Sequence, residues 1–501
     1  MSFQAISHLC DLDSSQIDLV VLPLFSLEKS STWAFKEEES TFFQASLSPM
    51  LKDHKGKREE LLFTYGGEGK ISPSTRLLFI GLGKEEKLTA EGLRISYAKV
   101  LQWSREKEWT RLALFLPQVG GMNEEEVAYA LFEGIQLANY HYTKKREEKK
   151  FFSPQVTLVG AENSVAKPLW EKCTQIISGV NVTRELVNEN ADHVTAPYLG
   201  EYAEKLFAER AGVKVEVFDR ARVEKEGMHL LLTVNRGSHL EPRFLLISYQ
   251  GNPSSSDHTV LVGKGVTFDT GGLNLKTTKH IEDMRTDMAG AATVLGTLDA
   301  ISQLGLKVNV TGVIPATDNP IGSKSYKPGD VYPSHSGKSV EIGNTDAEGR
   351  LILADALSYS CKHLEPSRII DFATLTGAIV IALGERIAGV MSNDSGLVEQ
   401  LRHAGELSCE RVWPLPLCEE YRASIRSTIA DVRNTGKRGA SSITAALFLQ
   451  EFVAESIPWA HLDIAGTAYR SQAEEYHSTQ ATGFGVRLVV QFLSTLEKTQ
   501  N

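Results

Sequence analysis

Basic residues are fewer than acidic residues in this sequence of 501 residues. Lysine and arginine together number 53 against 63 aspartates and glutamates, which gives a formal net charge of −10. Broad, nonspecific binding to nucleic acids relies on an excess of lysine and arginine that faces the phosphates. The charge balance therefore argues against that class of function, although it leaves room for a local basic groove.

Cysteines are also few, and no two of them form a C-x-x-C pair. The five are widely separated, at Cys10, Cys173, Cys361, Cys409 and Cys418. This pattern fits neither a disulfide framework nor a thiolate zinc site. The first residues, MSFQAISHLCDLDSSQ, lack the charged and apolar stretches of a signal peptide, and no run reaches the roughly 18 apolar residues that cross a membrane. These absences predict a cytoplasmic protein.

A single hydrophobic core stops growing at roughly 250–300 residues, so a chain of this length is expected to form two domains. Short apolar runs alternate with helical patterns along the chain, which predicts an α/β fold. The expected strands are 17–25, 76–82, 111–116, 156–160, 244–249, 259–262, 307–314 and 368–373, and the expected helices are 89–105, 124–140, 164–187, 288–304 and 351–363.

The domain boundary is expected around residues 163–184. A smaller N-terminal α/β domain would span 1–163, a connecting helix 164–184, and a larger C-terminal α/β domain 185–501. Strands that alternate with helices predict a mainly parallel central sheet in the larger domain, covered on both faces. In such sheets ligands lie beyond the carboxyl ends of the strands.

Three segments of the larger domain carry side chains that suggest chemistry. They are VGKGVTFDTGGLNLK, which follows an expected strand, MRTDMAGAA, which opens a helix of small residues, and NTDAEGR, which precedes another helix. Together they contribute four carboxylates, two lysines and one arginine, which are Asp269, Asp287, Asp346, Glu348, Lys264, Lys276 and Arg350. A single acid of this kind is more commonly a helix cap or a surface charge, so the interest lies in their convergence on strand ends.

In the third segment, charged side chains occupy every second position. Asp346, Glu348 and Arg350 are separated by small residues. An extended stretch would place all three on one face, whereas a helix would separate Asp346 and Glu348 by about 200°. The spacing therefore predicts a loop or strand end that leads into a helix.

Four carboxylates in one pocket repel strongly unless cations neutralise them. Their charges sum to about −4, which two divalent ions would balance. If Lys264 is a ligand, it must be the neutral amine, because an ammonium group has no lone pair. Burial beside two cations lowers a lysine pKa and makes that form accessible. Lys276 and Arg350 would remain as cations that face substrate oxygens.

These segments resemble the leucyl (cytosol) aminopeptidase family of dinuclear metallopeptidases. NTDAEGRL at 344–351 reads as the family's signature, and the resemblance covers most of residues 185–490. Further blocks that resemble the family are VGKGVTFDTGGLNL, DMAGAATVL, DFATLTGAIVIALG, SITAALF, WAHLDIAGTA and ATGFGVRL. Tyr469 follows one of these blocks where the family usually has tryptophan.

The resemblance implies a role for each matching residue. One metal ion would be held by Lys264, Asp269, Asp287 and Glu348, and the other by Asp269, Asp346 and Glu348. Lys276 would help to polarise the scissile carbonyl, and Arg350 would cradle a bicarbonate ion that serves as general base. The positions expected around the substrate's first side chain are Met284, Asn344, Ala347, Thr374, Leu375 and Gly377.

The same resemblance implies an aminopeptidase that removes unsubstituted N-terminal residues from peptides in intracellular peptide turnover. It implies two Mn²⁺ or Zn²⁺ ions per subunit, a homohexamer, and an N-terminal domain similar to macro domains. Three alternatives stay open at this point. They are an additional DNA-binding or regulatory role, ADP-ribose binding by the N-terminal domain, and hydrolysis of phosphate esters. For ADP-ribose binding, the segment GLGK at 81–84 is a weak phosphate-loop candidate.

Overall fold

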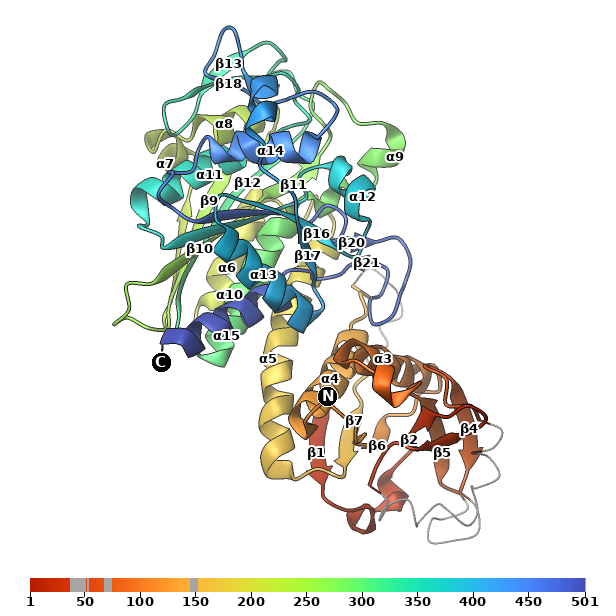
Figure 1. The fold of residues 1–501 in the computed structure, drawn as a ribbon. Coiled ribbons are helices and arrows are strands. Elements are labelled where there is room, and N and C mark those ends of the chain that lie inside the picture. The colour runs from red at the N-terminus through yellow and green to blue at the C-terminus, as the bar shows by residue number, and fades with distance from the viewer. Residues whose placement is uncertain (37–50, 52–53, 67–73, 145–151, 501) are drawn as a thin grey trace. The chain divides into compact units, whose positions relative to one another are not determined.

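The computed structural model describes residues 1–36, 51, 54–66, 74–144 and 152–500 (Figure 1). The chain divides into two compact units. The first comprises Met1–Ile177 and Gln472–Ser478, and the second comprises Ser178–Ser471 and Thr479–Asn501. The division falls inside helix α5 (Asn163–Asn188), in the stretch that the sequence predicts as a connecting helix.

The first unit is built on a seven-stranded sheet with the order β1-β7-β6-β2-β5-β4, to which β3 adds beside β2. Its elements are β1 (Ser2–Ile6), β2 (Leu19–Ser26), β3 (Ser31–Trp33), β4 (Leu61–Tyr65), β5 (Arg76–Gly81), α3 (Ala90–Glu106), β6 (Arg111–Phe115), α4 (Glu124–Ala138) and β7 (Gln155–Val159). Strands β1, β7, β6, β2 and β5 run parallel to their neighbours in this order. The predicted N-terminal α/β character is therefore confirmed.

Residues 472–478 belong to the first unit although they lie close to the C-terminus of the chain. The hydroxyl of Tyr476 donates a hydrogen bond to Glu91 Oε1 at 2.8 Å, and Gln102 Nε2 donates to the carbonyl of Glu475 at 2.7 Å. The range predicted for the larger domain, 185–501, thus includes a short segment that packs with the smaller unit.

The second unit is built on a nine-stranded sheet with the order β17-β16-β19-β15-β10-β12-β9-β8, to which β11 adds beside β12. Its strands are β8 (Val213–Phe218), β9 (Arg243–Gln250), β10 (His258–Gly263), β11 (Gly265–Asp269), β12 (Asn309–Asn319), β15 (Arg368–Ala373), β16 (Ala388–Ser392), β17 (Val412–Pro414) and β19 (Trp459–Asp463). A small three-stranded sheet consists of β13 (Val331–Pro333), β14 (Ser339–Glu341) and β18 (Val432–Arg433). A two-stranded sheet consists of β20 (Tyr469–Arg470) and β21 (Gln480–Ala481).

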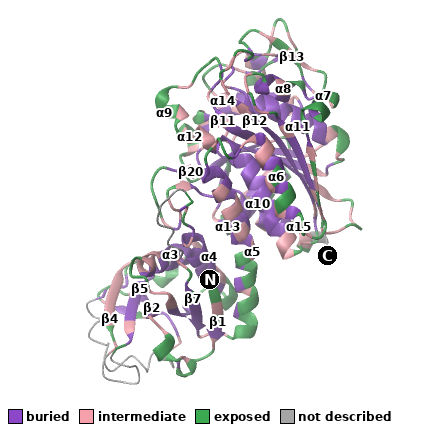
Figure 2. Cartoon of the chain, turned by 180° about the vertical axis from the view of Figure 1, so that it is seen from behind, coloured by how far each residue is buried: buried purple, intermediate pink, exposed green. Residues whose placement is uncertain are grey.

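Helices cover both faces of this sheet (Figure 1). The helices of this unit are α6 (Ala196–Phe207), α7 (Arg220–Lys225), α8 (His229–Asn235), α9 (Thr278–Ile281), α10 (Ala289–Leu304), α11 (Gly349–His363), α12 (Gly377–Leu383), α13 (Ser395–Ser408), α14 (Ser441–Gln450) and α15 (Val486–Gln500). Helix α10 packs on β10, β12 and β15 and contacts α15, while α11 packs on β10 and β12 and contacts α8 and α14. Figure 2 shows the buried residues concentrated in the central strands and in α10 and α11.

The four central strands, β19, β15, β10 and β12, run parallel to one another, which confirms the prediction of a mainly parallel sheet. The reason is visible in β10, where Val260, Leu261 and Val262 are completely buried in an unbroken apolar run. Such runs are typical of strands covered on both faces. The outer part of the sheet departs from the prediction, because β9 is antiparallel to β12 and β16 is antiparallel to β19. In the described part of the chain, no helix has both the length and the apolar character needed to cross a membrane.

One buried carboxylate ties the helical layer around α11 together. Asp355, on α11, is fully buried. Its Oδ2 accepts hydrogen bonds from the backbone N–H groups of Leu230 at 2.8 Å and Leu231 at 3.0 Å, at the start of α8, and its Oδ1 accepts from the N–H of His335 at 2.8 Å. Helix N-termini carry free N–H groups that must find an acceptor when they are buried.

The Asp355→Ala variant is expected to lower the stability of the protein by about 3 kcal/mol, because it leaves three N–H groups, two of them fully buried, without an acceptor at about 1–3 kcal/mol each. Urea unfolding followed by circular dichroism measures the change. The matched control is Asp355→Asn, which keeps one side-chain oxygen as an acceptor and should lose less. A loss below about 1 kcal/mol in Asp355→Ala would show that α8 finds other acceptors.

Candidate metal centre and active site

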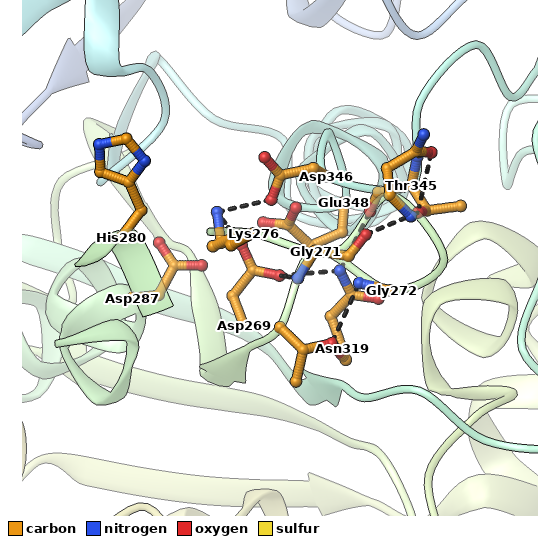
Figure 3. Close-up of polar contacts among 12 residues, drawn as sticks. Asp269, Gly271, Gly272, Lys276, His280, Asp287, Asn319, Thr345, Asp346 and Glu348 are labelled. Atoms are coloured by element: carbon orange, nitrogen blue, oxygen red, sulfur yellow. Dashed lines mark hydrogen bonds and ion pairs between the residues drawn. The ribbon is translucent and has the colours of Figure 1, made fainter. Parts of the chain in front are cut away.

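The candidate residues gather beyond the carboxyl ends of neighbouring strands in the second unit. Lys264 follows β10 directly, Asp269 is the last residue of β11, and Thr374 follows β15. Asp287 lies in the short 3₁₀ helix Met284–Met288, which contacts β11 and leads into α10. This is the position expected for ligands in parallel sheets. Figure 3 shows the acids and Lys276 turned toward one another.

Two lysines, the buried Lys264 and the partly exposed Lys276, lie among the carboxylates. The Nζ atom of Lys264 is 2.6 Å from Asp287 Oδ1 and 3.0 Å from Glu348 Oε1. The Nζ atom of Lys276 is 2.8 Å from Asp269 Oδ2 and 2.5 Å from Asp346 Oδ1. The structure therefore brings together all five predicted metal ligands and one of the two predicted catalytic residues.

The carboxylates have the geometry and the free oxygen atoms of a cation site. One oxygen from each of Asp269, Asp346 and Glu348 lies within 4.8 Å of the others. Two further oxygens, Asp287 Oδ2 and Glu348 Oε2, are buried and accept no hydrogen bond from the described residues. Buried acceptors without partners are costly, and carboxylate oxygens with a lysine amine form a suitable donor set for Mn²⁺ or Zn²⁺. The residues present thus fit divalent metal ions.

The ionisation of these groups reflects burial opposed by the lysines. Burial raises the pKa of Asp269 to about 6, with the nearby charge of Glu348 adding to the effect, and burial raises the pKa of Asp287 well above its usual value. Burial also opposes ionisation of Glu348, but Lys264 and Lys276 attract its negative charge and hold its pKa below the usual value. The four carboxylates therefore repel one another more than the two lysines can offset, and additional cations would stabilise their ionised forms.

Burial lowers the pKa of Lys264, but the attraction of Asp287, Glu348 and Asp269 outweighs it and raises the pKa above its ordinary value. Among these carboxylates alone, Lys264 is therefore an ammonium ion. Ligation of a metal ion requires the neutral amine, and a divalent cation nearby favours that form because it repels the ammonium charge. The prediction of a neutral Lys264 thus applies to the metal-bound protein.

A tight turn after Asp269 depends on glycine. Gly271 has a φ of +85°, and its N–H donates a hydrogen bond to Asp269 Oδ1 at 2.8 Å. A Cβ atom at this position would lie 2.5 Å from the carbonyl oxygen of Asn274. Asn319, the fully buried last residue of β12, donates to the same Asp269 oxygen at 2.8 Å and to the carbonyl of Thr345 at 3.0 Å.

The segment that carries Asp346 and Glu348 is a turn directly before α11, in agreement with the predicted loop or strand end that leads into a helix. The side chain of Asn344 accepts a hydrogen bond from the N–H of Asp346 at 2.8 Å, which closes the turn. Glu348 has φ −74° and ψ −40°, which are helical values, and α11 begins at Gly349, two residues before the predicted start. The predicted lead into a helix N-terminus is correct. Local hydrogen bonding by asparagine outcompetes an extended backbone here.

Arg350 lies in the first turn of α11 and is anchored differently from the lysines. Its Nη1 donates a hydrogen bond to the carbonyl oxygen of Asn434 at 2.7 Å. Burial lowers the pKa of Arg350 to about 10, which still leaves a positive charge at neutral pH.

The predicted substrate-binding positions fall into two groups. Thr374 contacts the cluster directly, because its hydroxyl donates to Asp287 Oδ1 at 2.7 Å and its carbonyl accepts from Lys264 at 3.0 Å. Asn344 and Ala347 flank the ligand Asp346 in the turn, and the N–H of Leu375 donates to Asp463 at 3.1 Å. For the half-buried Met284 and the exposed Gly377, the described contacts give no hydrogen bond or ion pair to the cluster.

Several polar residues that support the site were not identified as site residues from the sequence. Asp463 accepts from the hydroxyl of Thr376 at 2.6 Å and so fixes the loop that carries Thr374. Asp371 accepts from Trp459 Nε1 at 2.7 Å and lies 2.6 Å from His461 Nδ1. These residues are in the blocks DFATLTG and WAHLDIAGTA, where a polar residue inside an otherwise apolar strand was the available signal.

Comparisons with known proteins agree with this geometry. The family model described as "Cytosol aminopeptidase family, catalytic domain" matches residues 181–490, and the model of the N-terminal domain of the same family matches residues 21–149. A probable cytosol aminopeptidase of Protochlamydia amoebophila is 46% identical over 90% of this chain and 90% of its own length. One from Chlamydia abortus is 46% identical over 95% of this chain and 96% of its own length.

Solved structures show the same similarity. A mutant of tomato leucine aminopeptidase has a TM-score of 0.86 and 28% identity, covering 99% of this chain and 96% of that one. The bottromycin maturation enzyme BotP in complex with Mn has a TM-score of 0.84 and 30% identity, covering 96% of this chain and 100% of that one. The fold, the acidic centre and these relatives together show that the chain belongs to the cytosol aminopeptidase family and is a metal-dependent aminopeptidase.

Proposed function

We propose that the chain removes unsubstituted N-terminal residues from peptides with the help of two divalent ions. The observation that carries this proposal is the cluster of four acids and two lysines at the carboxyl ends of the central strands. Its charges are unbalanced, and two of its buried oxygens accept no hydrogen bond from the described residues. Two divalent cations would correct both features at once.

The arrangement of the acids supports a division of ligands between two ions. Lys264 contacts Asp287 and Glu348, which groups these three residues with Asp269 around one ion. The close triad of Asp269, Asp346 and Glu348 would hold the other, so that Asp269 and Glu348 serve both. When bound, such ions supply Lewis acidity, which lowers the pKa of water and polarises a peptide carbonyl. Mn²⁺ or Zn²⁺ suits the donors, and the Mn complex of BotP favours manganese.

The residues of the chain itself would bind and orient the peptide. Lys276, whose side chain is 15% exposed, has the charge and the access to donate a hydrogen bond to the scissile carbonyl oxygen. Arg350 offers a buried guanidinium that suits a small planar anion such as bicarbonate, which would accept and return a proton. Asp287 would receive the free α-amine of the substrate, which restricts cleavage to the N-terminal residue.

We further propose that Met284, Asn344, Ala347, Thr374, Leu375 and Gly377 surround the first side chain of the substrate. A homohexamer in the cytoplasm, acting in peptide turnover, is the setting that the family resemblance favours.

Neither the comparisons nor the geometry supports a DNA-binding role, ADP-ribose binding or phosphate-ester hydrolysis. The last of these would want more cations than Lys276 and Arg350 around the acids.

Variants of the two cations and of a shared acid should separate chemistry from metal binding. Lys276→Ala and Arg350→Ala are expected to lower kcat for an aminoacyl amide by about 100–1,000-fold, the effect of removing a group that stabilises charge in the transition state. Both should retain two metal ions per subunit. Asp269→Ala should lose metal as well as activity, because Asp269 serves both ions in the proposed arrangement. Metal analysis of the purified proteins beside turnover measures each effect.

Full activity in Asp269→Ala would contradict the assignment of Asp269 as a ligand of both metal ions. The function itself is tested by a pair of peptides that differ only in acetylation of the N-terminus. Cleavage of the free peptide alone supports an aminopeptidase that binds the α-amine, whereas equal cleavage of both would overturn that part of the proposal.

Gly349 tests the placement of Lys264. A Cβ atom at Gly349 would lie 2.4 Å from Lys264 Cε and 2.7 Å from its Nζ atom, so an alanine there must displace the lysine. Gly349→Ala is expected to weaken metal binding and to lower kcat by on the order of 100-fold, since displacement by about 1 Å has effects of that size. Gly439→Ala is the matched control, because a Cβ atom at Gly439 meets no atom within 4 Å. Equal activity of the two variants would contradict the placement of Lys264 among the ligands.

A further inference from the structure

Both polar groups of the Asn434 side-chain amide form hydrogen bonds with the backbone of the segment that carries Asp346 and leads to Glu348. Asn434 is fully buried and follows β18 directly. Its Oδ1 accepts hydrogen bonds from the N–H groups of Gly343 at 2.7 Å and Asn344 at 3.3 Å, and its Nδ2 donates to the carbonyls of Asn344 at 2.8 Å and Ala347 at 3.3 Å. Both acceptor and both donor positions of the amide are therefore filled.

The main chain of Asn434 reaches a second part of the site. Its carbonyl oxygen accepts the hydrogen bond from Arg350 Nη1 at 2.7 Å, while its N–H donates to the carbonyl of Glu341 at 3.0 Å. The Nε atom of Arg350 is buried and has no hydrogen-bond partner among the described residues. One residue thus holds both the turn 343–347 and the guanidinium of Arg350.

The chemistry of the contacts calls for an amide at this position. Aspartate has nearly the same shape and could accept from Gly343 and Asn344, but when ionised it cannot donate to the carbonyls of Asn344 and Ala347. Alanine could do neither and would leave several buried backbone groups unpaired, which is unfavourable. A side chain that only filled space would not need its polar atoms aligned with four backbone groups.

We propose that Asn434 is a positioning residue of the aminopeptidase reaction, which fixes Asp346, Glu348 and Arg350 in one arrangement. The inference rests on the roles proposed above for those three residues. Asn434 acts through them, because its bonds go to the backbone around the acids and to the guanidinium. Outer groups that orient metal ligands typically change metal affinity or activity by about 10–100-fold.

The test uses the full-length protein loaded with Mn²⁺ and an aminoacyl amide as substrate. Asn434→Ala is expected to lower kcat by about 10–100-fold at saturating metal and substrate. Asn434→Asp, which keeps the acceptors and loses the donors, should be impaired as well. Folding of both variants is checked by circular dichroism. If Asn434→Ala does not fold, Asn434→Asp provides the test. Wild-type kcat in the folded, metal-loaded variants would overturn the proposal.

Asn235→Ala is the matched control. Asn235 is also fully buried, and its amide donates to the carbonyl of Leu240 at 3.0 Å and to the hydroxyl of Thr317 at 3.1 Å, with no bond to the turn 343–347. This variant should lose stability while its folded fraction keeps wild-type kcat. A general effect of losing a buried amide would lower kcat in both proteins and would contradict a specific role of Asn434.

A double-mutant cycle tests whether Asn434 acts through Arg350. In an Arg350→Ala background, adding Asn434→Ala should lower kcat by a smaller factor than it does alone, because part of its target is already gone. The same factor in both backgrounds would overturn the link to Arg350. If the wild-type protein and Asn235→Ala both fail to cleave aminoacyl amides, the proposed function fails, and this outcome is distinct from failure of the inference on Asn434.

Discussion

The accumulation of negative charge in a mostly buried space is the constraint on which the site depends. Asp269, Asp287 and Glu348 are each at most 4% exposed, and Asp346 adds a fourth carboxylate beside them. Carboxylates this close cannot all stay ionised without cations among them. The parallel sheet meets this demand because the carboxyl ends of its strands open to one edge, where Lys264 and the acids arrive from separate segments. The need for cations therefore explains why a site of this kind lies at that edge.

Most of the architecture could be predicted because its causes are local. The run of Val260, Leu261 and Val262 specifies a strand buried on both faces, and the acidic start of α4 is capped by Asn123, whose side chain accepts from the N–H of Glu126. The glycine pair after Asp269 is a local cause as well, because Gly271 and Gly272 both adopt positive φ values that other residues disfavour. Antiparallel pairing of β9 was not predictable in this way, because an apolar run does not record the direction of its neighbour.

The site was predicted less completely than the fold. The period-two spacing of Asp346 and Glu348 predicted a loop or strand end before a helix, but it did not reveal that the side chain of Asn344 closes a turn there. Asn319 and Asn434 went unnoticed because their partners lie tens of residues away in the chain, at Asp269 and at Asn344. Hydrogen bonds of that range depend on the assembled sheet, so a single sequence gives no pattern for them.

Neutral amides, rather than further charges, hold the turns that carry the ligands. Asn319 binds Asp269, Asn274 binds Thr345, and Asn434 binds the turn at Asn344. An amide donates and accepts at once, so it matches both groups of a peptide bond without changing the net charge. A lysine in the same place would compete with metal ions for the carboxylates, and another acid would add repulsion. Because these three amides are uncharged, they can be packed closely around the acids, and the remaining positive charge is left for divalent ions to supply.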